Sequence, residues 1–288
     1  MGAIGLRRNV LDVLLGENVM DLIYLYLIAP LHTGGTTQEG NLLGIARESH
    51  TNLPYVPSST IRGRIRASAS DARRCQLFGN DLDSGETLTQ GDIWIGDGSI
   101  LWLPVPSLSH GVVWVSSPLL LRRWARYQAN SQLLNLMTKL DEKSNSQIYS
   151  TNFSTTASVY LKDAILKTPN LDKWDALDQF IPTSEATNGI TKAIVLPDQH
   201  CATLIQMSLW RQVKIKLDEH KTVDGGFRYE EAIPPDTLMY LPWGITSQAN
   251  GSSETSRKAF QDLLSDHSIL QIGGQESLGR GFVQQWLA

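Results

Sequence analysis

Near its end the chain carries the segment Gln271-Ile-Gly-Gly-Gln-Glu-Ser-Leu-Gly-Arg-Gly-Phe-Val283, with four glycines among residues 273–281. Glycine permits positive φ angles and the close approach of a second backbone, so such a loop suits a tight turn or a bound phosphate. Arg280, between two glycines, adds a guanidinium that can bind a phosphate through paired hydrogen bonds. The segment has neither the Gly-Lys-Ser/Thr of a Walker loop nor a Gly-x-Gly-x-x-Gly opening a helix. Two interpretations stay open, a phosphate cradle and a plain connection before a last strand at 282–287.

The composition is that of a globular protein, with 41% hydrophobic and 19% charged residues. A formal net charge of −4 argues against a generic, salt-driven hold on nucleic acid. The arginines are nevertheless clustered, five of them between residues 58 and 77 against the single acid Asp71. The sequence therefore indicates a locally basic surface on an acidic protein.

The two cysteines are too few for a disulfide framework or a zinc site, which suits a reducing cytosol and predicts a cytoplasmic protein. The longest apolar run, residues 22–30, is too short to span a bilayer, so we expect no membrane contact. Residues 1–19 carry two arginines before an apolar run that Asp12 interrupts. This pattern favours a short amphipathic extension over a signal peptide.

Short strands alternating with a few helices predict an α+β sheet protein. We expect strands at 21–29, 92–95, 100–104, 111–115, 193–196 and 237–241, and helices at 60–76, 118–140, 171–180 and 256–264. Residues 204–209 fit either type, and loops are expected at 31–41 and, rich in serine, around 141–156. Alternating apolar and basic residues at 213–217, with a return at 227–233, predict a long β-hairpin.

The expected helix at 60–76 begins after a serine N-cap at Ser58 or Ser59. Its spacing places Arg62, Arg66 and Arg73 on one face. An ordinary solvated arginine face is the alternative, but the scarcity of acids favours a binding surface.

Three stretches together resemble the RAMP proteins, the RNA-binding subunits of CRISPR effector complexes. They are Leu31-His-Thr-Gly-Gly35, then Ile45-Ala-Arg-Glu48 with Pro54 and Ser59-Thr-Ile-Arg-Gly63, and finally the glycine-rich segment. Two more, Pro104-Val-Pro-Ser107 with Val115-Ser-Ser-Pro-Leu-Leu-Leu-Arg-Arg123 and Gly225-Gly-Phe-Arg-Tyr-Glu-Glu-Ala-Ile-Pro-Pro235, narrow the resemblance to the repeated backbone subunit of Cmr-type (type III-B) complexes.

The resemblance implies one RAMP domain over 20–288, a ferredoxin-like (RRM-type) palm with insertions and a thumb hairpin around 212–234. It implies polymerisation along a crRNA, a complementary target RNA, copies of the same chain and other effector subunits as partners. A guide bound without sequence preference requires phosphate contacts and backbone amides. The residues expected to bind RNA are Ser59, Arg62, Arg66, Arg73, Gly273, Gly274, Gly279, Arg280 and Gly281, and the expected thumb residues are Lys214, Lys216, Phe227 and Arg228.

Target cleavage in the resembled family relies on Mg²⁺ and on an aspartate shortly before the Ile-x-Arg-Glu motif. Here that interval reads Asn41-Leu-Leu-Gly44 and contains no aspartate, so we expect a binding subunit without efficient cleavage. The alternative is an endoribonuclease that uses Glu39 or another carboxylate, with Mg²⁺ as its only cofactor. The candidate catalytic residues are His32, Glu39, Asn41 and Glu230. For His32 a loop hydrogen bond, and for Glu230 a cross-strand pair with Lys214 or Lys216, are the structural alternatives.

Overall fold

The computed structural model describes residues 20–39, 42–80, 89–128, 130–247 and 253–288, with only the backbone described at 35–39. The expected extension at residues 1–19 lies outside the described part of the chain. None of the described helices combines the length and the hydropathy that crossing a bilayer requires.

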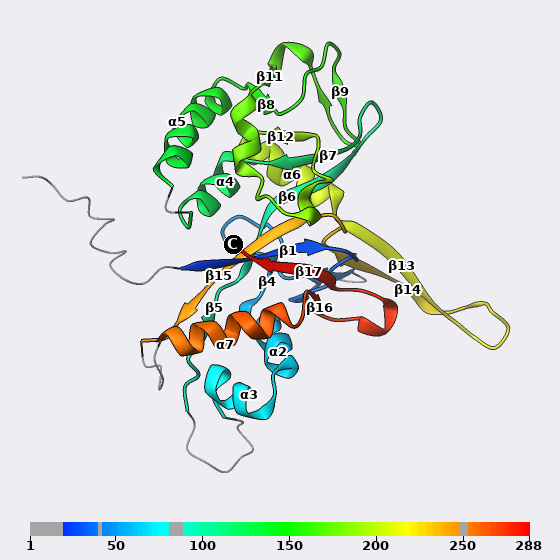
Figure 1. Cartoon of the computed structure of the whole chain (residues 1–288). Helices are drawn as coiled ribbons and strands as arrows, with labels where there is room; N and C mark the ends of the chain where they lie inside the picture. The colour runs from blue at the N-terminus through cyan, green and yellow to red at the C-terminus, as the bar shows by residue number, and fades with distance from the viewer. Residues whose placement is uncertain (1–19, 40–41, 81–88, 129, 248–252) are drawn as a thin grey trace, which may run out of the picture.

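The centre of the molecule is a large mixed sheet around β1 (Asp21–Leu27) (Figure 1). β1 pairs antiparallel with β15 (Leu238–Ile245) on one side and with β17 (Phe282–Leu287) on the other. β6 (Gly98–Ser107) pairs antiparallel with β15, which makes the central order β6-β15-β1-β17. β1 is buried on both faces because its continuous apolar run serves one core on each side of the sheet.

Helices cover both faces of this sheet. α2 (Ser58–Ser68), α3 (Asp71–Phe78) and α7 (Ser253–Ser265) lie on one face, where Ile61, Ile65 and Phe260 enter the first core (Figure 1). α4 (Pro118–Ala125) and α5 (Ser131–Asn145) contribute Trp124 and Met137 to the second core. α2 and α3 belong to the connection from β1 to β6, and α7 belongs to the connection from β15 to β17. Both connections therefore cross the same face of the sheet.

Shorter strands extend the sheet beyond β6. β7 (Gly111–Ser116), β12 (Ala193–Val195), β8 (Tyr149–Thr151) and β11 (Leu171–Lys173) follow in that order, and β16 (Ile269–Gln271) lies at the other edge. The remaining elements are β4 (Tyr55–Val56), β5 (Ile93–Ile95), the pair β9 (Val159–Tyr160) and β10 (Ile165–Leu166), α6 (Asp198–Ser208), and the 3₁₀ turns η2 (Thr168–Asn170), η3 (Asp175–Phe180), η4 (Glu185–Thr187) and η5 (Glu276–Leu278).

A long hairpin projects from the body, as predicted (Figure 1). β13 (Trp210–Leu217) ends at the tip where predicted, whereas β14 (Val223–Ala232) begins closer to the tip than expected, so the turn is confined to residues 218–222. Asp218 closes this turn, because its carboxylate accepts hydrogen bonds from the backbone N–H groups of His220 and Thr222, both at 2.9 Å. At its base β14 pairs with β3 (Leu42–Ile45), which in turn pairs with β2 (Gly34–Glu39).

Several sequence-based predictions need correction. The helix predicted over 60–76 is two helices, because Ala69 is extended, with φ −81° and ψ 142°. The helix predicted over 118–140 also divides, at residues 126–130, and its second part continues to Asn145. Much of the loop predicted over 31–41 forms β2, and the loop around 141–156 contains the end of α5 and β8. The helix predicted over 171–180 is β11 followed by a 3₁₀ turn, and 204–209 belongs largely to α6.

Candidate nucleic-acid interface

An open groove of about 410 Å³ lies where three segments meet, namely the start of α2, the start of β2 and the glycine-rich loop 273–281. Its lining residues are mostly small or hydroxylated, with one cation: Gly34, Ser59, Thr60, Gly63, Arg64, Gln271, Gly273 and Gly274. Small side chains let a ligand approach the backbone of these segments closely, and a helix N-terminus adds a partial positive charge. The groove therefore suits an anionic backbone such as that of RNA.

The α2 wall follows from the packing of its other face. Ile61 and Ile65 are buried one turn apart, so Ser59, Gly63 and Arg64 point away from the core. Neither predicted serine is the N-cap, because the helix begins directly after Pro57. The first turn of α2 contains no acidic side chain of its own, but Asp97 from the segment before β6 accepts a hydrogen bond from Ser58 N–H at 2.7 Å, so one of the free N–H groups is already occupied.

Arg64 is the cation of the groove, and sequence reasoning missed it. Its Nε is buried and has no hydrogen-bond partner among the described residues. Helical spacing could have placed Arg64 correctly. Ile61 and Ile65 both face the core, and Arg64 directly precedes Ile65, so it lies at the edge of the buried face. The exposed face next to it carries Ser59 and Gly63.

The glycine-rich loop packs against the segment that follows β1. Gly274 N–H donates to the carbonyl oxygen of His32 at 3.0 Å, and Gly281 N–H donates to that of Pro30 at 2.9 Å. Gly273 and Gly281 have φ angles of +79° and +77°, and a Cβ would lie 2.4 Å from His32 O and 2.0 Å from Ile272 O respectively. Glycine is therefore required at both positions. Gly279 also has a positive φ, but its surroundings are open.

Arg280 does not point into the groove. Only 4% of it is exposed; its guanidinium lies 4.4 Å from the ring centre of Trp210, and Nη1 is 3.1 Å from the Glu230 carboxylate. Nη2 donates to Gln212 at 2.7 Å. In this arrangement Arg280 ties the glycine-rich loop to the base of the hairpin, and its contact with a phosphate stays a prediction.

The arginines predicted to share one face are used differently. Arg62 and Arg66 donate to the carbonyl oxygen of Phe78 at 2.9 and 3.2 Å, so they cap the C-terminus of α3. Burial, followed by the charge of Arg66, lowers the pKa of Arg62. Arg73 lies on α3 and pairs with Asp266 at 3.4 Å. Arg62 and Arg66 share a face of α2 as predicted, whereas Arg73 does not share it because the helix divides at Ala69; RNA contacts by these three arginines stay a prediction.

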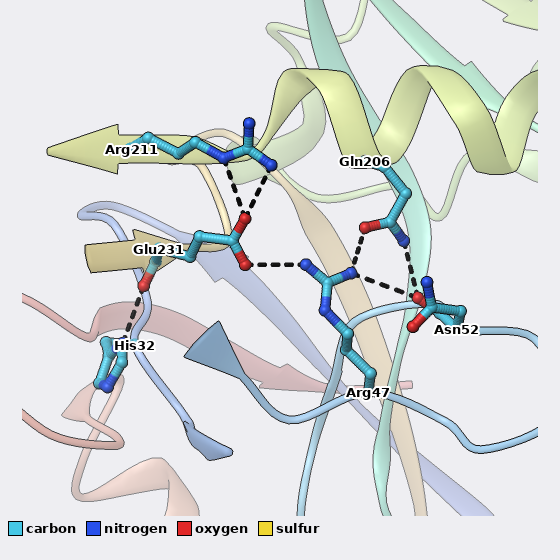
Figure 2. A network of polar contacts seen from close by, with 6 residues as sticks. All are labelled: His32, Arg47, Asn52, Gln206, Arg211 and Glu231. Atoms are coloured by element: carbon cyan, nitrogen blue, oxygen red, sulfur yellow. Dashed lines mark hydrogen bonds and ion pairs between the residues drawn. The ribbon is translucent and has the colours of Figure 1, made fainter. Parts of the chain in front are cut away.

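Two consecutive glutamates at the base of β14 are buried in ion pairs. The Glu231 carboxylate accepts from Arg47 at 2.8 Å and from Arg211 at 2.9 Å, and its backbone oxygen lies 2.8 Å from His32 Nδ1 (Figure 2). Glu230 pairs with Lys214 at 2.8 Å, which is the cross-strand alternative foreseen for it. Burial opposes its ionisation, yet Lys214, Gln275 and Arg280 outweigh that effect and lower the pKa of Glu230.

The described residues do not form a Mg²⁺ site. Among them, no three His, Cys, Asp or Glu side chains gather in a way that could hold a metal. Glu48 is engaged by Arg123 at 2.8 Å, and Glu230 and Glu231 are each neutralised by two or more cations. Asn41 and the side chain of Glu39 lie outside the described residues. Glu48, Glu230 and Glu231 are thus committed to cations and do not fit a hard divalent ion in this arrangement.

The hairpin presents two different faces. Val213 pairs with Tyr229 and Ile215 with Phe227, which puts exposed apolar side chains on one face. Lys214 lies opposite Arg228 on the other face. Of the predicted thumb residues, Phe227 therefore belongs to the apolar face and Lys214 and Arg228 to the charged one; Lys216 pairs with Asp224 at 2.6 Å near the tip.

Comparison with known proteins gives three consistent findings. A family model described as the RAMP superfamily matches residues 24–284. The CRISPR system Cmr endoribonuclease Cmr4 of Pyrococcus furiosus is 28% identical over 278 residues, which cover 91% of this chain and 94% of that protein. A chain of the Type III-B Cmr-beta complex bound to cognate target RNA is similar with a TM-score of 0.72 and 22% identity, over 93% of this chain and 96% of that chain. Oligomeric Cmr4 from Pyrococcus furiosus is similar with a TM-score of 0.65 and 24% identity, over 93% and 98%.

Proposed function

The chain belongs to the RAMP superfamily, and from this membership we propose that it is a backbone subunit of a type III-B CRISPR ribonucleoprotein effector. In this role it polymerises along the crRNA and holds the guide–target duplex for antiviral defence. Its partners are the crRNA, complementary target RNA, further copies of itself and other effector subunits, in the cytoplasm. The observation that carries the proposal is the groove between α2 and the glycine-rich loop.

The groove supports the binding of a guide regardless of its sequence. Its side-chain donors are the hydroxyls of Ser59 and Thr60 and the guanidinium of Arg64. Hydroxyl and guanidinium donors bind phosphate and ribose oxygens, and contacts to these groups carry no sequence information. A net charge of −4 with a local basic site fits a filament subunit, in which one surface contacts RNA and others contact protein.

The fold supports the same role. We infer that the central order β6-β15-β1-β17, with α2, α3 and α7 on one face, is a ferredoxin-like palm within a single domain over 20–288. β13 and β14 then form its thumb, which we propose contacts the guide–target duplex. Similarity to chains of Cmr complexes, at TM-scores of 0.65–0.72, is in line with this assignment.

Cleavage of target RNA is the second candidate function, because the Pyrococcus furiosus relative is named an endoribonuclease. The carboxylates that the structure places around the groove and hairpin base are ion-paired, and no aspartate occurs at residues 41–44. We therefore propose binding without efficient cleavage. Assembled complex incubated with labelled complementary RNA and Mg²⁺ separates the two functions. Intact, tightly bound target supports the first, whereas regularly spaced cuts that Glu39→Ala abolishes establish the second.

The guide-binding role is tested by substituting Arg64 with alanine. Each lost phosphate contact reduces the slope of log affinity against log salt by about 0.7 for a single strand. We expect Arg64→Ala to lower crRNA affinity and to reduce this slope by about that amount, and Arg126→Ala to change neither. Arg126 is a matched control because it is exposed at the end of α4, away from the groove lining. Equal salt slopes for wild type and Arg64→Ala would refute guide binding in this groove.

A further inference from the structure

The hairpin β13–β14 has little to hold its outer part in one direction. In β14, residues 223–229 are exposed, and burial begins abruptly at Glu230 and continues through Ala232. The apolar side chains of the outer part, among them Ile215 and Phe227, are about half exposed. The direction in which the hairpin projects is therefore decided at its base.

We propose that Glu231 and Glu230 form a joint that fixes this direction, with Glu231 as its principal positioning residue. Consecutive residues of a strand point to opposite faces, so the two carboxylates restrain the hairpin from both sides. Neither residue needs to touch RNA for this role. The proposal concerns the folded chain alone; only its consequence for RNA rests on the proposed function.

On one face, Glu231 joins three separate segments (Figure 2). Arg211 lies opposite Glu231 in the hairpin, and its Nε and Nη2 both approach the same carboxylate oxygen at 2.9 Å. Arg47, from the segment after β3, binds the other oxygen at 2.8 Å. Arg47 also contacts Gln206 of α6, which donates to Asn52 O at 2.7 Å. One carboxylate thus links the hairpin to the body on the side of α6.

The burial of the Glu231 carboxylate strengthens its ion pairs with Arg47 and Arg211. Only 1% of the Glu231 side chain is exposed, whereas Arg211 is 56% exposed and its positive charge stays hydrated. A buried carboxylate is stable when cations and hydrogen bonds satisfy both oxygens, as Arg47 and Arg211 do here. Removing the charge leaves two guanidinium groups beside each other without their shared partner.

On the other face, Glu230 joins the hairpin to the glycine-rich loop. Its Oε2 accepts from Lys214 at 2.8 Å, Gln275 at 3.0 Å and Arg280 at 3.1 Å. Arg280 in turn binds Gln212, which lies opposite Glu230 in the hairpin. The ion pair between Arg280 and Glu230 therefore links the loop that lines the groove directly to the base of the hairpin.

The backbone contacts at the base leave room for tilting. Among the described residues, β14 pairs with β3 at two positions, Tyr229 with Leu42 and Glu230 with Leu43. A bridge between Leu31 and Ile233 lies just beyond the hairpin. A short ladder along one edge fixes where the hairpin is attached but permits rotation about that edge, and the side-chain pairs on both faces restrict this rotation.

His32 connects the joint to the groove. Its Nδ1 lies 2.8 Å from Glu231 O, and its own carbonyl oxygen accepts from Gly274 N–H, a residue of the groove lining. His32 is thus the residue through which a change in the direction of the hairpin would alter the groove, and through which a change in the groove would alter the hairpin. In an assembled complex this arrangement would keep the hairpin at a constant angle to the bound guide.

The joint is tested by measuring distances between spin labels in the free chain. Cys75 is exposed and takes one label, whereas Cys201 is buried with a raised thiol pKa and does not react. A second label goes on the hairpin tip through Glu219→Cys. We expect Glu231→Gln to broaden and shift the distribution of distances, and Glu142→Gln, at an exposed position of α5, to leave it unchanged. An unchanged distribution in Glu231→Gln would overturn the proposal.

If Glu231→Gln does not fold, Arg211→Ala decides the question, because it removes one of the two guanidinium contacts at a half-exposed position. A broader distribution supports the joint, and a wild-type distribution overturns it. In assembled complex, the fluorescence of 2-aminopurine placed in the target RNA should differ between Glu231→Gln and wild type while crRNA retention stays at the wild-type level. A wild-type chain that retains no crRNA would contradict the proposed function, whereas the distances in the free chain would still judge the joint.

Discussion

Gly279 and Gly281 offer a matched pair for testing how the glycine-rich loop is built. Both have positive φ, +73° and +77°, so alanine at either position carries a similar backbone strain. They differ in space, because a Cβ at Gly279 meets nothing within 4 Å and one at Gly281 would lie 2.0 Å from Ile272 O. The difference between Gly279→Ala and Gly281→Ala therefore isolates the close approach of the two loop arms.

The magnitudes follow from this geometry. The left-handed conformation destabilises the folded state of an alanine variant by about 1–2 kcal/mol. Alanine also lowers the conformational entropy of the unfolded chain, which offsets about 0.4–1 kcal/mol of that cost. Gly279→Ala should thus reduce the free energy of unfolding by about 1 kcal/mol. Gly281→Ala must also move the loop and break the bonds from Gly281 N–H to Pro30 O and from Ile272 N–H to Gly281 O. At about 1 kcal/mol for each bond, its total cost is about 3 kcal/mol.

Urea unfolding of the two variants, followed by tryptophan fluorescence, measures this difference. With a slope of about 3 kcal/mol per molar urea, a gap of about 2 kcal/mol separates the two midpoints by about 0.7 M. Gly281→Ala should have the lower midpoint. Coincident midpoints would show that the loop arms do not approach as closely as described, and the account of the loop would then be wrong.

Three further predictions use the same chain. A thiol reagent should modify Cys75 rapidly and Cys201 only on unfolding, because burial raises the pKa of the Cys201 thiol; mass spectrometry of the native protein showing two modified thiols would contradict this. Arg62→Ala should lower the free energy of unfolding by about 1 kcal/mol through the lost cap at Phe78 O, and an unchanged urea midpoint would argue against the cap. The pKa of Glu230 is lowered in the folded state, so its contribution to stability is present above the unfolded value of about 4.3 and is lost as the pH falls through the folded value. The midpoint difference between wild type and Glu230→Gln should accordingly narrow in acid, and a difference that widens there would refute this.

The elements that sequence patterns predicted well are those in which one local signal dominates. β1 is a continuous apolar run, and the hairpin alternates apolar and basic residues on both sides of a polar turn. Both elements could be predicted without knowing which segments pack beside them. The start of β14 was less accurate, because this strand continues past a register shift through residues of low strand propensity such as Asp224 and Gly225.

The interface was only partly predictable. The glycines at 273 and 274 and Ser59 were recognised as backbone-exposing or hydroxyl-bearing, and the structure brings these residues to one groove. The arginines could not be sorted by spacing, because the division of the helix at Ala69 depends on how α3 packs on α7. Whether an arginine binds a phosphate or a buried glutamate is a tertiary property. Arg280 illustrates this, since its partners Glu230 and Gln212 lie in the hairpin, 50 and 68 residues earlier in the chain.

The pairing of β1 with β17 has a consequence for synthesis. Ile23 lies beside Leu287 and Leu27 beside Val283, so the middle of the sheet joins the two ends of the described chain. Until residues 282–287 have been made, the apolar strand β1 has an unpaired edge, which is a site for mispairing with other nascent chains. Such long-range pairing also slows folding, because the chain must close a large loop before the contact forms. β1 therefore gains this neighbour only after β17 has been synthesised, and a chaperone or partner that covers the open edge has its greatest effect before that point.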